Sequence, residues 1–69
     1  MTDILIKSFD HFATKTFIEI YKRENQYYFI LARLNGTILF NSAKENVFYD
    51  TEDEAIQYAF SEFEESEWI

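Results

Sequence analysis

The residues of this sequence that could do chemistry are one histidine and many carboxylates. His11 follows Asp10, and a histidine oriented by a carboxylate can act as a general base. Neighbouring residues point in different directions, however, and no convincing nucleophile accompanies the pair. We therefore expect no catalytic residue, and the protein is predicted not to be an enzyme.

Carboxylate pairs could also share a cation, and Glu62 with Glu65 or Asp50 with Asp53 are the nearest candidates. A calcium loop alternates oxygen ligands on a glycine-containing turn, and no such pattern occurs here. A zinc site needs cysteines or several histidines, and the chain has one histidine and no cysteine. The sequence predicts no metal and no cofactor.

The carboxylates are unevenly distributed. Residues 50–69 contain eight acidic residues and no lysine or arginine, whereas residues 1–49 carry a net charge of +1. The whole chain has a formal net charge of −7, which would repel phosphate at long range. Direct nucleic-acid binding is therefore not expected, although aromatic and basic residues alternate in the middle of the chain.

The acidic stretch should form a helix. Thr51 and Glu54 fit a capping box, and acidic residues in the first turn suit the helix dipole. Apolar residues then recur at helical spacing and should face the core: Ile56, Ala59, Phe60 and Phe63. The carboxylates would project away from this stripe, with Glu62 on its flank.

Upstream of the helix, the pattern is that of strands. Asn35-Gly36 is the preferred pair for a two-residue type I′ turn, and β-branched and aromatic residues fill both flanks, 26–34 and 37–43. Another strand is expected over 16–22, joined by a turn at Glu24-Asn25. The two registers place six apolar residues on one face: Ile18, Ile20, Phe29, Leu31, Ile38 and Phe40. The other face would carry Phe17, Glu19, Tyr21, Tyr28, Ile30, Ala32 and Leu39.

The predicted fold is α+β: a three-stranded antiparallel β-meander with a C-terminal α-helix packed on one face and a short N-terminal segment. Residues 3–12 fit either a helix face or a strand alternation, and this choice stays open. The 69 residues should form a single domain, 1–69, held by apolar packing because disulfides are excluded. No signal peptide or membrane span is recognisable, which favours a cytoplasmic protein.

The central stretch resembles the YegP-like family of small uncharacterised bacterial proteins. The matching residues lie within 17–42: Phe17-Ile18-Glu19-Ile20-Tyr21-Lys22, Tyr27, Phe29, Leu31, Ala32, Asn35-Gly36, Ile38 and Ser42. The Gly-Tyr-x-x-Lys segment that precedes the helix in that family is not matched, since this chain runs through 46–51 without it. The resemblance implies a three-stranded meander plus helix, sometimes assembled as a dimer, and brings no catalytic residues.

Two functions follow as hypotheses. In the first, the protein is an acidic inhibitor or nucleic-acid-mimicking decoy that docks on a basic surface of a nucleic-acid-handling protein, as phage and mobile-element anti-defence proteins do. The partner-binding residues would then be Asp53, Glu54, Glu62, Glu64, Glu65, Glu67 and Trp68, with Phe63 as a further apolar anchor. The alternative is a YegP-like housekeeping interaction module, a homodimer through the second sheet face at Phe17, Tyr21, Tyr28 and Ile30.

Overall fold

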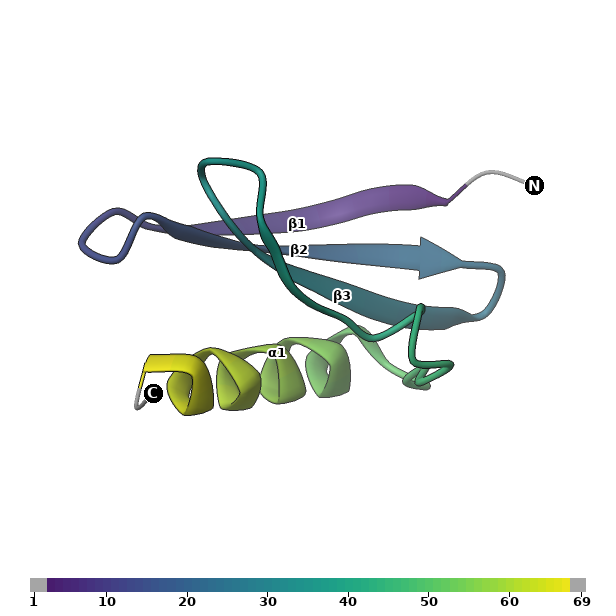
Figure 1. Cartoon of the computed structure of the whole chain (residues 1–69). Helices are drawn as coiled ribbons and strands as arrows, with labels where there is room; N and C mark the ends of the chain where they lie inside the picture. Colours follow the sequence, from purple (N-terminus) through teal and green to yellow (C-terminus); the bar gives the residue numbers. More distant parts are fainter. Residues whose placement is uncertain (1–2, 68–69) are drawn as a thin grey trace.

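The computed structural model describes residues 3–67, with side chains as far as residue 64. Four strands precede one helix: β1 (Ile4–His11), β2 (Thr16–Arg23), β3 (Gln26–Arg33), β4 (Ile38–Asn41) and α1 (Glu52–Glu67). The strands form one sheet in the order β1-β2-β3-β4, with every neighbouring pair antiparallel. The helix lies across one face of this sheet (Figure 1). The α+β class is confirmed, but the sheet has four strands rather than three.

The additional strand is the N-terminal segment, which the sequence left open between helix and strand. It pairs with β2 from Ile4↔Lys22 to His11↔Thr16, with one irregularity between Leu5 and Lys7. The apolar spacing of Leu5, Phe9 and Phe12 fits a helix equally well, so periodicity did not decide. Pairing of β1 with β2 satisfies alternate backbone amides and carbonyls of the two strands, and this tertiary contact settles the choice.

The register between β2 and β3 is the one predicted. Ile20 pairs with Phe29 and Ile18 with Leu31. All four side chains lie in the core, where their exposed fractions are at most 3%. Because side chains alternate along a strand, this register also places Tyr21 opposite Tyr28 on the other face.

The second hairpin differs from the predicted two-residue turn. The Arg33 amide donates to the Thr37 carbonyl at 2.8 Å, and the Gly36 amide donates to the Arg33 carbonyl at 2.9 Å. Gly36 has a φ of 97°, whereas Asn35 does not have a positive φ. A type I′ turn needs positive φ at both central residues. The connection is therefore a three-residue loop, 34–36, in which glycine takes the left-handed position.

This loop shifts the register of β4. Leu31 still pairs with Phe40 as predicted, but Ala32 pairs with Ile38, so the strand is irregular at Leu39. As a result Ile38, expected in the core, is 56% exposed. Leu39, expected on the other face, packs against the core. A one-residue slip reverses the faces in this way because the side-chain period of a strand is two.

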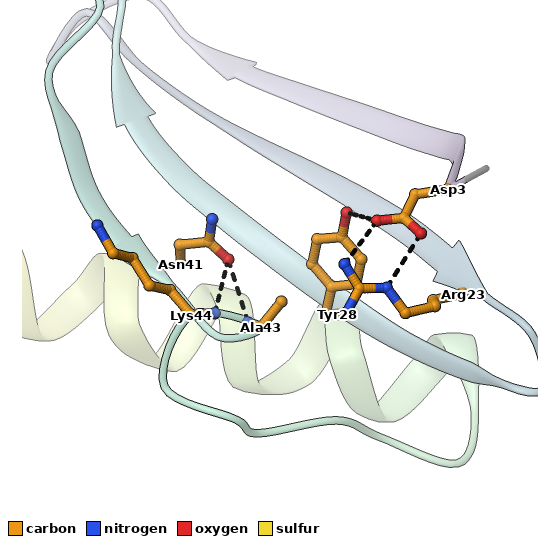
Figure 2. Close-up of polar contacts among 6 residues, drawn as sticks. All are labelled: Asp3, Arg23, Tyr28, Asn41, Ala43 and Lys44. Atoms are coloured by element: carbon orange, nitrogen blue, oxygen red, sulfur yellow. Dashed lines mark hydrogen bonds and ion pairs between the residues drawn. The ribbon is translucent and has the colours of Figure 1, made fainter. Parts of the chain in front are cut away.

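The segment between β4 and α1 is fixed to β3. The Ser42 hydroxyl accepts a hydrogen bond from the Phe29 amide at 3.0 Å, and Tyr27 and Tyr49 exchange two backbone hydrogen bonds of 2.8 Å. At the end of β4, the Asn41 side chain accepts from the amides of Ala43 and Lys44 (Figure 2). These contacts fix where α1 begins.

The helix contacts the sheet through its smallest side chains. Ala55 and Ala59 are fully buried against the core residues of β2 and β3. Ile56 and Phe63 are half-buried beside them, as predicted. Phe60, expected in the core, is instead 39% exposed. Alanines let the helix approach closely along their own line, and Phe60 lies on the flank of that line.

The core depends on Phe29, which is fully buried and stacks on Phe40 and Tyr49. Truncation to alanine in a core typically costs about 3–5 kcal/mol. A domain of this size has a total stability of the same order. We therefore expect Phe29→Ala to lose its thermal unfolding transition in circular dichroism. Phe12→Ala removes an equal volume from a ring that is 76% exposed and should unfold like the wild type; equal losses would contradict this core.

Candidate protein-binding surface

The N-terminus of α1 is capped as the sequence predicts. The Glu54 amide donates to the Thr51 hydroxyl at 3.1 Å, and that hydroxyl contacts the Glu54 carboxylate at 3.3 Å. The first turn contains Glu52, Asp53 and Glu54, whose negative charge is favourable at the positive end of the helix dipole. This end of the helix is thus stabilised by its acidic residues.

The C-terminal end of α1 is not stabilised by its acidic residues. The last turn of α1 contains no basic residue, and the chain places Glu64, Glu65 and Glu67 there, with Glu62 in the turn before. Negative charge near a helix C-terminus is unfavourable, by roughly 0.3–1 kcal/mol for each exposed group at low salt. These glutamates therefore oppose the stability of the helix.

The carboxylates occupy both flanks of α1. On the flank toward β1, Glu52 makes an ion pair of 2.8 Å with Lys7, and Asp53 adds a weaker electrostatic effect on the same lysine. Glu64 is exposed and falls on this flank by helical spacing. On the flank toward β4, Glu62 lies near Tyr49 and contributes to raising its pKa, behind burial and Tyr58.

Most of these charges are unpaired. Among residues 3–64, whose side chains the structure describes, Asp53, Glu62 and Glu64 make no ion pair. Glu54 is engaged only with Thr51 at the cap. The predicted residues Glu65 and Glu67 lie in the helix, but their side chains are outside the described part, and Trp68 lies outside the described residues altogether.

Two aromatic side chains lie among these carboxylates and were not predicted as part of the surface. Tyr58 is 53% exposed and stacks on Tyr49 at 5.0 Å; Phe60 is 39% exposed and meets Phe9 edge-on at 5.3 Å. Each ring thus stacks on or meets one other aromatic ring and keeps a large part of its surface exposed. The signal was available, since Tyr58 falls outside the apolar stripe of the helix. By contrast, the predicted anchor Phe63 is half-buried against His11.

The second sheet face is the other predicted interaction surface. By strand alternation Phe17, Tyr21, Tyr28 and Ile30 lie on the sheet face opposite the core residues, as expected. Figure 1 shows that α1 covers the other face of the sheet. Phe17, Tyr21 and Ile30 are half-buried, whereas Tyr28 is 6% exposed. Tyr28 is thus largely committed to contacts within the chain.

A polar cluster holds Tyr28 in place (Figure 2). Arg23 makes a two-pronged contact with the Asp3 carboxylate, at 3.0 and 2.9 Å, and the Tyr28 hydroxyl donates to the same carboxylate at 2.6 Å. The guanidinium also lies over the rings of Tyr28 and Phe48, at 5.3 and 5.4 Å. Sequence gave no signal for this cluster, because its members are far apart along the chain.

The cluster shifts the pKa of its members. Hydrogen bonds from Arg23 and Tyr28 lower the pKa of Asp3 from 3.8 to about 2. Burial, followed by the hydrogen bond to Asp3, raises the pKa of Tyr28 to about 12. Burial, followed by Glu19, also raises the pKa of Tyr21. Each shift favours the protonation state that the hydrogen bonds require at neutral pH.

The catalytic candidates His11 and Asp10 do not point toward each other. His11 donates or accepts through Nδ1 to the Thr14 hydroxyl at 2.8 Å, and Asp10 lies on the opposite face of β1 by alternation. The described residues contain no group of three or more histidines, cysteines or carboxylates placed to hold a metal ion. Among the described residues, no helix is both long enough and apolar enough to cross a membrane.

No family model matches the chain, and neither a curated protein nor a solved structure matches it. The resemblance to the YegP-like family therefore stays a prediction. The surfaces of this molecule have to be interpreted from their own chemistry.

The pKa of Asp3 makes the stability of the domain depend on pH. Because the folded pKa of about 2 lies below the usual 3.8, the stabilisation is present above about pH 4 and is lost as the pH falls toward 2. Urea unfolding at a series of pH values should show wild type more stable than Asp3→Asn at neutral pH, with the difference shrinking below about pH 4. In the Arg23→Gln variant, the substitution Asp3→Asn should lower the stability at neutral pH by less than it does in the wild type. A difference in stability between wild type and Asp3→Asn that does not change with pH would contradict the lowered pKa of Asp3 in this cluster.

Proposed function

We propose that this chain is a small non-enzymatic binding protein that docks through α1 on a basic surface of another protein. By occupying that surface it acts as an inhibitor or decoy toward a nucleic-acid-handling protein. The supporting observation is the charge of α1: carboxylates on both flanks, exposed aromatic rings between them, and no basic residue in its last turn.

Solubility is the simpler explanation of such a helix, but it does not account for the absence of cations or for the glutamates near the C-terminal end. A solubilising helix gains from mixed charges, because glutamate and lysine four residues apart stabilise each other. Here the C-terminal glutamates oppose the helix dipole and repel one another. A stability cost of this kind is expected where the charges serve a partner, as they do in electrostatically complementary interfaces. The exposed Tyr58 and Phe60 add the aromatic contacts in which interfaces are enriched.

The dimensions of the helix support a nucleic-acid-binding target. Glu54 and Glu62 are eight residues apart, about 12 Å along the axis, and the two acidic flanks are separated by about the helix diameter of 10–12 Å. Grooves of duplex DNA are about 6–12 Å wide between their phosphate rows. Two rows of negative charge at this spacing can satisfy a basic surface that normally binds phosphates. This similarity of scale is the basis for proposing a decoy.

Neutralising carboxylates in the C-terminal part of the helix should weaken partner binding without harming the fold. We expect the triple variant Glu62→Gln, Glu64→Gln and Glu65→Gln to bind its partner at least about tenfold more weakly, since interfacial charges govern such association. The same variant should unfold at an equal or higher temperature, because the unfavourable dipole interaction is removed. The measurement is capture from nuclease-treated lysate at low and high salt, with added duplex DNA as competitor.

The matched control removes three carboxylates from exposed loop positions: Glu24→Gln, Glu45→Gln and Asp50→Asn. It has the same net charge as the helix variant and should keep its partner. Capture of a basic protein that DNA displaces, lost only in the helix variant, would support the proposal. Equal loss in both variants, or capture that DNA does not affect, would contradict it.

A second candidate is a homodimeric module of the YegP-like kind that associates through the second sheet face. It is favoured by one observation: among the described residues no helix covers that face, and Phe17 and Ile30 remain half-buried there. The decoy proposal predicts a monomer in light scattering at every concentration tested. A dimer that Phe17→Ser and Ile30→Ser dissociate would favour the second candidate instead.

A further inference from the structure

The sheet has one long open edge. β1 has eight residues and, among the described residues, pairs with β2 alone. The opposite edge is shorter and partly closed, because β4 has four residues and Tyr49 bridges to Tyr27 beyond it. An open edge presents unpaired amides and carbonyls and can accept a further strand. The irregularity between Leu5 and Lys7 leaves residues 7–11 as its regular part.

The hydrogen-bond alternation identifies which residues of β1 point outward. On β3, Tyr27, Phe29 and Arg33 bond to the segments on the β4 side, so the residues between them bond to β2. The residues of β2 that pair with these β3 residues therefore bond to β3, and the β2 residues between them bond to β1. Phe9 and His11 pair with this second set, so their backbone amides and carbonyls point toward β2. The amides and carbonyls of Ser8 and Asp10 therefore face away from the sheet.

A cavity opens beside these two residues. It has a volume of about 350 Å³ and lies between the edge strand and the C-terminal half of α1. Its walls are mainly apolar and include Phe9, His11, Thr16, Ile18, Phe60 and Phe63, with Ser8 and Asp10 also contributing. A space of this size accommodates one large side chain. An added strand at Ser8 and Asp10 would place alternate side chains over it.

The charge around the cavity is negative. Glu64 on α1 is an exposed carboxylate without an ion pair among the described residues, and Asp53 lies further along the same flank. Asp10 adds an exposed, unpaired carboxylate to the same edge strand, on its other face. The cation on this side, Lys7, is neutralised by Glu52 at 2.8 Å. A segment in which basic residues flank an apolar residue would match these carboxylates and the apolar cavity.

We propose that the β1 edge accepts an extended basic segment of the partner protein as a fifth strand, which bonds to Ser8 and Asp10 and inserts an apolar side chain into the cavity. The proposal rests on the proposed function in taking the partner as basic. It adds how that partner is held: backbone hydrogen bonds give affinity, the cavity selects one apolar residue, and the carboxylates select the basic neighbours.

A second copy of the chain fits this edge less well. Two-fold pairing of β1 with itself would bring two chains of net charge −7 together with their acidic helices on the same side of the joined sheet. A basic segment meets the opposite sign of charge at the same place. We therefore take the basic segment as the occupant, and a dimer is an outcome that the test can reveal.

The test uses a synthetic peptide of about eight residues in which lysine alternates with valine around a central phenylalanine, and an analogue with glutamate in place of lysine. Binding to the full chain is followed by NMR. The lysine peptide should shift the amides of residues 7–11 and the methyl groups of Ile18, and the glutamate peptide should not. Proline has no amide hydrogen, so Ser8→Pro should weaken binding about tenfold or more while the outward-facing position leaves the β1–β2 bonds intact. Ser8→Thr is the control and should bind like the wild type.

The outcomes are distinguishable. Equal binding of both peptides would overturn the basic occupant, and lysine-peptide binding unaffected by Ser8→Pro would overturn the edge. If Ser8→Pro unfolds, a peptide N-methylated on alternate residues gives the same information, since it should not bind the wild type. A wild-type dimer that Ser8→Pro dissociates would assign the edge to a second copy. If the acidic-helix variant loses the lysate partner while Ser8→Pro keeps it, the proposed function stands and the fifth strand is wrong.

Discussion

The close packing of α1 on the β2–β3 face is the interaction on which the rest of the structure depends. Ala55 and Ala59 bring the helix onto Ile20 and Phe29, all of them fully buried. With one helix and one sheet, this is the contact that closes the core, and without disulfides nothing covalent supports it. The outer face of the helix must then meet solvent or a partner.

That geometry explains why the charge of the molecule is segregated. The side of α1 that contacts the sheet is apolar, so its carboxylates are placed along the flanks and the outer face. The cations of the chain lie on the strands and loops, where Arg23 and Lys7 are already used in ion pairs. The result is an acidic helix held beside an open strand edge, and both features are available to the basic partner that we propose.

Much of this arrangement was predictable from sequence because it depends on local rules. The capping box at Thr51 and the β2–β3 register follow from hydrogen-bonding and alternation patterns within a few residues. The predictions that were wrong, and the choice that the sequence left open at the N-terminus, depend on longer-range effects. One extra loop residue, Leu34, together with the irregularity at Leu39, exchanged the environments of Ile38 and Leu39, and pairing with β2 made residues 4–11 a strand. Phe60 is exposed because the helix contacts the sheet along the line of Ala55 and Ala59. Helical periodicity alone does not predict which line of the helix makes that contact.

Whether α1 is the docking face is tested most directly by titrating isotope-labelled protein with the captured partner and following the backbone amides by NMR. We expect the perturbed amides to fall along α1 and on residues 7–11 of β1, with the signals of Tyr21 and Ile30 unchanged. Perturbations confined to the second sheet face, with α1 unaffected, would contradict the acidic helix as the functional surface.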